Sequence, residues 1–275
     1  MKKVLIAAGA ILIAAFQNCS KVDFGQDPFY YGSLGVCNGV SCDLDPLTEK
    51  PAVVTILIAM GDEANNQLVV NGASSQLIAE TVVRYVSPKR NPKILIVRDS
   101  ASGSEDPEDT KYVASQLLIR YSTKYIDEPA EGLSEADLAD YDIVWFNNPG
   151  APMGKKKSRD TLLTFNGGVI LQGDDLSRGG DFDLSSLTGL KYVENGTSLK
   201  CGNKTYNHND NNGEKYVVSL DSQKITGTSE VLTFRYGNDI DFTKVVRPDL
   251  EVLAWAKGGP DDCTEKFPAI VRYKK

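Results

Sequence analysis

Histidine is nearly absent from this sequence, which has only His208 among its 275 residues. The five cysteines include no Cys-x-x-Cys pair. Structural zinc sites draw on closely spaced cysteine and histidine ligands, so the sequence argues against a zinc site. A catalytic nucleophile that is activated by a histidine base would have to use His208, and this histidine lies in an asparagine-rich segment.

The sequence also lacks phosphate-binding glycine motifs, because neither Gly-x-Gly-x-x-Gly nor Gly-x-x-x-x-Gly-Lys-Ser/Thr follows any apolar run. The net charge is −7 and the isoelectric point is near 4.9, which disfavours binding to nucleic acid or to anionic lipid. No second long apolar run follows the one at the N-terminus. We therefore expect no nucleotide cofactor, no nucleic-acid partner and no membrane-spanning helix in the mature protein.

Residues 1–18 have the pattern of a signal peptide, with two lysines before the apolar run Val4–Phe16. That run is shorter than the roughly 20 residues needed to span a bilayer. Cys19 follows, and the arrangement resembles a bacterial lipoprotein signal, although the two residues before the cysteine are not the usual small ones. The resemblance implies acylation of Cys19, for example with palmitate. Because Ser20 rather than aspartate follows, it also implies anchoring to the outer membrane of the bacterial cell envelope. In the alternative interpretation, the signal peptide is an ordinary one.

The other four cysteines are an even number in a chain expected to be exported, which favours disulfide bonds. The most economical pairing joins Cys37 to Cys42 and Cys201 to Cys263, and other pairings stay open. Residues 19–50 are rich in glycine, proline and aspartate and show no sustained periodicity. We interpret them as a tether that carries a small disulfide loop.

From residue 51 onward, apolar runs alternate with segments of helical spacing. One expected helix follows Ser74 or Ser75 as its N-cap, and a second follows Ser134. Strands that are apolar on both faces and alternate with helices indicate a parallel sheet covered on both sides. Residues 51–275 are thus predicted to form one α/β domain. Its fold class is a three-layer, doubly wound, mostly parallel sheet of the flavodoxin-like kind, with C-terminal β-hairpins.

Acidic and amide side chains follow several of the predicted strands. Ligands of open α/β sheets bind beyond the carboxyl ends of the strands, so these ends define a candidate ligand or metal site. It consists of Asp99, Asn147, Asp174 and Asp175. Oxygen ligands of this kind suit a divalent cation, and no other cofactor is expected. Two alternatives stay open, since Asp174 and Asp175 also suit helix capping and turns, and paired carboxylates also serve hydrolases.

The segments KILIVRDS, YDIVWFNNPG, GGVILQGDD and PAIVRYK occur in this order and resemble the class I glutamine amidotransferase-like superfamily. The resemblance extends over most of residues 51–275. Active members carry a cysteine nucleophile at the elbow after the strand that corresponds to GGVILQG, where this chain has Asp174. The resemblance therefore implies a non-catalytic member that binds an envelope protein or a small ligand, or acts as a scaffold.

A second resemblance concerns ILIVRDSASGS, which is similar to the metal-binding strand of von Willebrand A-type domains. Those domains hold a cation with an Asp-x-Ser-x-Ser motif. Here Asp99 is followed by Ser100, Ser102 and Ser104, one residue out of that register. This resemblance implies a metal-dependent adhesion or ligand-binding module, which is the first alternative function. A hydrolase that uses the carboxylates at the strand ends is the second.

Overall fold

A computed structural model of the chain describes fourteen stretches or single positions, all within the unit Asp43–Lys275. They are residues 51–57, 72–87, 89, 91–99, 111, 113–147, 155–173, 185–194, 198–201, 204–207, 216–220, 232–236, 242–257 and 266–275.

A nine-stranded mixed sheet lies at the centre of this unit, in the order β10-β9-β12-β13-β1-β5-β4-β2-β3. The five strands from β1 to β3 in that order run parallel. The other four continue the sheet beyond β1 by antiparallel pairing. The strands are β1 (Ala52–Ile56), β2 (Lys93–Arg98), β3 (Ser122–Asp127), β4 (Ile143–Asn147), β5 (Gly168–Gln172), β9 (Tyr216–Leu220), β10 (Leu232–Tyr236), β12 (Glu251–Lys257) and β13 (Lys266–Lys274).

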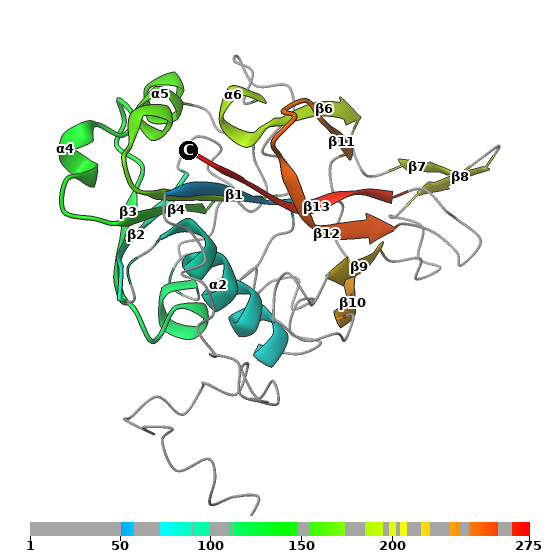
Figure 1. Cartoon of the computed structure of the whole chain (residues 1–275), viewed down its shortest axis with the longest axis horizontal. Helices are drawn as coiled ribbons and strands as arrows, with labels where there is room; N and C mark the ends of the chain where they lie inside the picture. The colour runs from blue at the N-terminus through cyan, green and yellow to red at the C-terminus, as the bar shows by residue number, and fades with distance from the viewer. Residues whose placement is uncertain are drawn as a thin grey trace, which may run out of the picture. The chain divides into compact units, whose positions relative to one another are not determined.

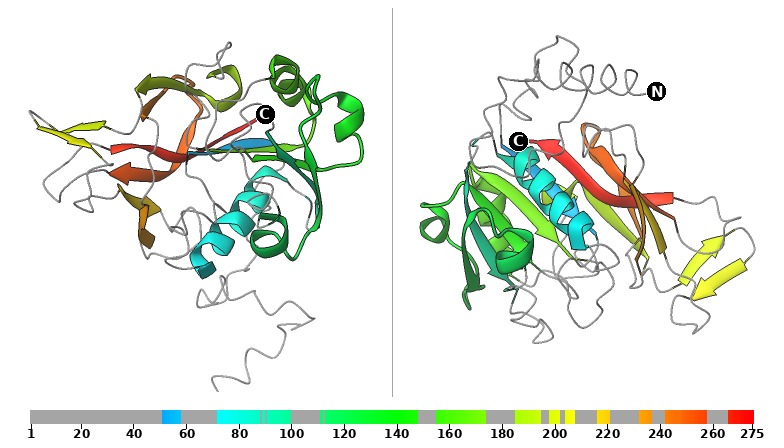
Figure 2. Two further views of the ribbon diagram at one scale, coloured as in Figure 1. Left: turned by 180° about the vertical axis from the view of Figure 1, so that it is seen from behind. Right: turned by 90° about the horizontal axis from the view of Figure 1, so that it is seen from below.

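Helices cover both faces of the sheet. The helices are α2 (Gly72–Val86), the short π-helix η3 (Val113–Leu117), α4 (Glu135–Leu138), α5 (Lys156–Thr164) and α6 (Ser185–Thr188). Figure 1 shows α4, α5 and α6 on one face and α2 on the other, and the views in Figure 2 agree. The α/β fold expected from the sequence is confirmed in this three-layer arrangement.

The sheet separates two hydrophobic cores, because successive side chains of a strand point to opposite faces. In β4, Ile143 and Trp145 pack with the α2 layer, whereas Val144 and Phe146 pack with the α4–α6 layer. All four side chains are fully buried. Both faces of the parallel strands are therefore apolar. For this reason their sequences are nearly continuous hydrophobic runs.

The segments EVLAWAKGG and FPAIVRYKK, which the sequence predicts to form an antiparallel pair, are paired as β12 and β13. β13 additionally pairs with β1, so these strands belong to the central sheet. Two further two-stranded sheets lie outside it, one formed by β6 (Leu190–Glu194) and β11 (Phe242–Val245) and the other by β7 (Ser198–Cys201) and β8 (Lys204–Asn207). β13 is tied to α6 by the Tyr273 hydroxyl, which donates to the Leu187 carbonyl at 2.7 Å.

The helix starts were predicted with mixed success. Ser134 precedes α4 as expected, and its backbone N–H and hydroxyl both donate to the Asp137 carboxylate, at 2.8 and 2.6 Å. The assignment of Ser74 or Ser75 as the cap of α2 was wrong, because this helix begins at Gly72. Capping side chains favour the position before a helix, but serine also occurs within the first turn, so the residue type alone did not locate the start.

Candidate functional site

The candidate site is built on the aligned carboxyl ends of four parallel strands. Arg98 at the end of β2 lies opposite Asp127 on one side and Asn147 on the other. Asn147 in turn lies opposite Gln172 at the end of β5. The register continues past β2, since the Asp99 N–H donates to the Asn147 carbonyl at 3.2 Å. The residues that end these strands are therefore neighbours along one edge, with side chains that alternate between the two faces of the sheet.

Asp99 and Glu128 form a buried carboxyl pair at this edge. Their exposed fractions are 0% and 3%, and Asp99 is close enough to raise the pKa of Glu128. Glu128 is fixed in place by its own N–H, which donates to the Arg98 carbonyl at 2.8 Å. Burial and a neighbouring carboxyl group both favour the protonated form of a carboxyl group. Glu128 therefore keeps its proton below about pH 7.

The pKa of Glu128 is raised to about 7. Burial is the largest cause, because it disfavours the charged carboxylate, and the neighbouring Asp99 adds to it. The Ser158 hydroxyl donates to Glu128 Oε1, and this bond and the Lys155 ammonium act in the opposite direction. Burial and Asp99 prevail over both of these groups. The result is a carboxyl group that changes protonation near neutral pH.

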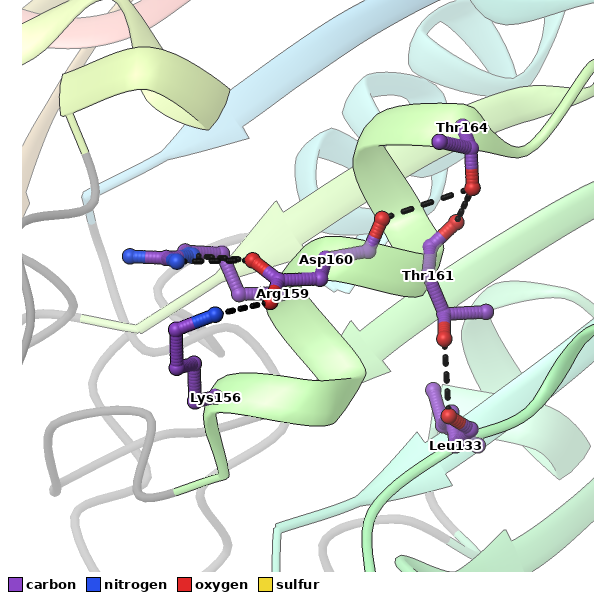
Figure 3. Close-up of polar contacts among 6 residues, drawn as sticks. All are labelled: Leu133, Lys156, Arg159, Asp160, Thr161 and Thr164. Carbon is purple, nitrogen blue, oxygen red and sulfur yellow. Dashed lines mark hydrogen bonds and ion pairs between the residues drawn. The ribbon is translucent and has the colours of Figure 1, made fainter.

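Helix α5 supplies Ser158, and Figure 3 shows how this helix is held. The Thr161 hydroxyl donates to the Leu133 carbonyl at 2.8 Å, and the Leu133 N–H donates to Ser158 Oγ at the same distance. On the outer side of the helix, Asp160 receives hydrogen bonds from Lys156 and Arg159. The two bonds to Leu133 join α5 to the segment that precedes α4 and hold Ser158 where its hydroxyl donates to Glu128, whereas the Asp160 bonds stay within the helix.

Two buried amides lie at the same edge but on the α2 face, since each follows an α2-facing residue, Trp145 or Ile170, by two positions. Asn147 and Gln172 are 1% and 0% exposed. Gln172 Oε1 accepts a hydrogen bond from the Trp145 indole N–H at 3.0 Å, which fixes the orientation of the glutamine amide. Buried amides and carboxyls are costly to desolvate, so a row of them beneath one edge of a sheet marks that edge as a polar site.

The structure brings two of the four predicted site residues together. Asp99 and Asn147 lie on adjacent strands at the same edge, whereas Asp174 and Asp175 lie outside the described residues. No set of three or more acidic, histidine or cysteine side chains in the described stretches is placed to hold a metal ion. The four-residue site as a whole stays a prediction.

The predicted lipidation site and disulfide bonds also stay predictions. Cys19, Cys37, Cys42 and Cys263 lie outside the described residues, and of Cys201 the structure gives the backbone, at the end of β7. The described helices include none with the length and apolar character to cross a bilayer.

Sequence reasoning missed three residues of the polar row. Glu128 directly follows the weakly apolar strand β3, so its place at the edge was visible, but nothing pointed to its burial. Gln172 ends the apolar run of β5 and could have been recognised as a polar residue inside a buried strand. Ser158 gave no signal, because its role depends on how α5 docks.

The chain was compared with family models, with curated proteins and with solved structures, and none of the three comparisons found a match.

Proposed function

We propose that the chain is an outer-membrane lipoprotein anchored through Cys19. In this proposal, residues 51–275 form a doubly wound, flavodoxin-like domain that is a non-catalytic member of the class I glutamine amidotransferase-like superfamily. The domain binds a polar ligand or an envelope protein at the carboxyl edge of its parallel strands, and serves binding or scaffolding in the cell envelope.

The observation that carries the binding role is the row of buried carboxyl and amide groups at this edge. Asp99, Glu128, Asn147 and Gln172 present hydrogen-bonding groups along the edge where open α/β sheets bind ligands. The same row disfavours cysteine chemistry. Nearby carboxylates raise the pKa of a thiol, whereas a nucleophilic thiolate needs a lowered pKa.

The sequence after β5 supports a non-catalytic domain. β5 ends at Gln172, and Gly173 and Asp174 follow it. Active members of the superfamily carry their cysteine at this elbow, and an aspartate cannot take its place as a thiolate nucleophile. The parallel strands with helices on both faces also suit this superfamily.

The anchor is tested by labelling. We expect a bacterial host that expresses the full chain in the presence of an alkyne-bearing palmitate analogue to yield a labelled protein in the outer-membrane fraction. The Cys19→Ser variant should be unlabelled and should leave that fraction. A wild-type chain that carries no label, or a Cys19→Ser variant that carries as much, would contradict the lipoprotein proposal.

The binding site is tested by thermal unfolding of the full chain in EDTA and then with Ca²⁺, Mg²⁺, Mn²⁺ or Zn²⁺. A ligand at about 100 times its Kd adds about 2.7 kcal/mol of stability, or several degrees in the midpoint. We expect no selective rise with any cation. A rise that disappears in both Asp99→Asn and Asp174→Asn would instead favour the metal-dependent adhesion module.

The Asp99–Glu128 pair favours a second candidate, a hydrolase that uses these carboxyls as acid and base. A general acid works best with a pKa near the working pH, and the pKa of Glu128 is about 7. Both carboxyl groups are buried and so are poorly accessible to a substrate. We therefore rank the binding role above the hydrolase. Release of p-nitrophenol from p-nitrophenyl esters or glycosides by the wild-type chain, lost in Glu128→Gln, would establish the hydrolase.

A further inference from the structure

A cleft lies at the opposite edge of the parallel strands, where β1, β4 and β5 begin. Its volume is about 490 Å³, within the range of pockets that hold small molecules. Pro51 before β1 and the Gly167–Gly168 pair at the start of β5 form its base, and residues of α4 and α5 form its walls. Lys89, which follows α2 in sequence, completes the lining. All the lining residues named here belong to the described stretches.

The glycines at its base let the backbones approach closely. A Cβ atom on Gly167 would lie 2.4 Å from the Asp142 carbonyl oxygen, and one on Gly168 would lie 2.5 Å from the Val86 carbonyl oxygen. Gly168 also donates its N–H to the Asp142 carbonyl at 2.9 Å. The base of the cleft is therefore packed backbone and rigid, which favours a preformed site.

Two aromatic side chains and several polar groups converge on the cleft. Tyr141 and Phe165 are both half-buried and line it. Three of the polar side chains have no hydrogen bond or ion pair in the described part of the chain: the Glu135 carboxylate, the Tyr141 hydroxyl and the Asn166 amide. A salt bridge between Lys89 and Asp142 adds a charged pair to the lining.

This set of groups selects against several ligand classes. The carboxylates Glu135 and Asp142 repel an anion, so a phosphorylated or carboxylate ligand would fit poorly. A wholly apolar ligand would bury the Tyr141 hydroxyl and the Asn166 amide without partners, which costs binding energy. The lining therefore disfavours anions and wholly apolar molecules, and suits a ligand that is rich in hydroxyl or amide groups and flat enough on one side to lie against an aromatic ring.

A sugar ring meets these requirements. Each hydroxyl both donates and accepts a hydrogen bond, as do the Asn166 amide and the Tyr141 hydroxyl, while Glu135 accepts and Lys89 donates. The C–H groups on the face of a sugar ring pack against aromatic side chains such as Phe165. We propose that this cleft binds a saccharide unit of a glycan. The site is separate from the carboxyl edge, so the proposal does not depend on the function assigned there.

The test is calorimetric titration of the full chain, in detergent micelles, with triacetylchitotriose and separately with maltotriose. We expect a Kd below about 1 mM, or −4.1 kcal/mol, for at least one of the two probes. Tyr141→Ala should weaken this binding about tenfold or more, by the loss of an aromatic anchor. Asn166→Ala and Glu135→Gln should each weaken it several-fold, and both residues are exposed, so these variants should fold.

Tyr125→Ala is the matched control, because this tyrosine is also exposed but lies on β3 and does not line the cleft. Its Kd should equal that of the wild type. Failure of both probes to bind at about 5 mM, five times the expected upper limit of Kd, would overturn the proposal. So would binding that is unchanged in both Asn166→Ala and Glu135→Gln, since the saccharide would then occupy a different surface.

Discussion

The raised pKa of Glu128 predicts an unusual dependence of stability on pH. The ordinary pKa of a glutamate is 4.5, and in the folded protein that of Glu128 is about 7. Between these values the folded state binds more protons than the unfolded state. Stability is then fully present below about pH 4.5 and falls as the pH rises through 7.

The size of this loss follows from the same two values. Each pH unit between them contributes about 1.4 kcal/mol, so the free energy of unfolding should fall by about 3 kcal/mol between pH 4.5 and pH 8. In a domain of this length, that corresponds to a drop in the midpoint of very roughly 6–12 °C. Most proteins become less stable as the pH falls over this range, whereas here stability should decrease as the pH rises. The direction of the change therefore distinguishes the effect of Glu128 from ordinary acid denaturation.

Glu128→Gln is the variant that isolates the effect. The introduced amide is neutral at every pH and can still accept from the Ser158 hydroxyl. We expect it to be close to the wild type at pH 5 and more stable by about 2–3 kcal/mol at pH 8. Urea unfolding at half-unit steps of pH measures both curves.

Asp127→Asn is the matched control, because Asp127 is the preceding residue but is 67% exposed and pairs with Arg98 at 2.7 Å. An exposed ion pair contributes less than about 1 kcal/mol, so this variant should keep the wild-type slope. The reasoning would be refuted if the free energy of unfolding of the wild type did not change between pH 5 and 8. It would also be refuted if the free energy of unfolding of Glu128→Gln fell with pH as steeply as that of the wild type.

Three further substitutions test the packing, each by urea unfolding against the wild type. Thr55 lies buried in β1 and its hydroxyl has no hydrogen-bond partner among the described residues, so Thr55→Val should stabilise the protein by about 1 kcal/mol; a loss of that size would contradict the assignment. Tyr273→Phe removes the buried bond to Leu187 and should cost about 1 kcal/mol, and no change would mean that water replaces it. Gly168→Ala should cost about 2 kcal/mol or more, because the added Cβ meets backbone, and an unchanged midpoint in urea would show that β5 shifts freely.

The parallel half of the sheet could be predicted because its strands carry apolar residues on both faces. β2, β4 and β5 each begin and end within a residue or two of the expected apolar runs. The helices were harder to delimit. The helical spacing of PEDTKYVASQLLIRY, with Pro107 and acidic residues at its start, predicts a helix, yet its longest described helical element is the five-residue π-helix η3. Local propensity is a weak guide where tertiary packing sets the helix length.

The sequence predicted the location of the candidate site but not the arrangement of its side chains. Parallel topology put Asp99 and Asn147 at one edge, which the register confirms. The pairing of Asp99 with Glu128 could not be foreseen, because it depends on the order of strands β2 and β3 in the sheet and on the docking of α5. The cleft at the other edge was also not foreseen, since its lining comes from loops and helix ends that no motif marks.

The position of β13 affects the order in which the protein folds. This strand is separated from β1 by more than 200 residues of sequence, yet it lies between β1 and β12 in the middle of the sheet. Ala52 pairs with Lys274, so the two halves of the sheet join only when residues near 274 are available. Contacts so distant in sequence form slowly. For a chain that crosses a membrane through a secretion channel, as the proposed signal requires, this delay would keep the polypeptide open until β13 has crossed.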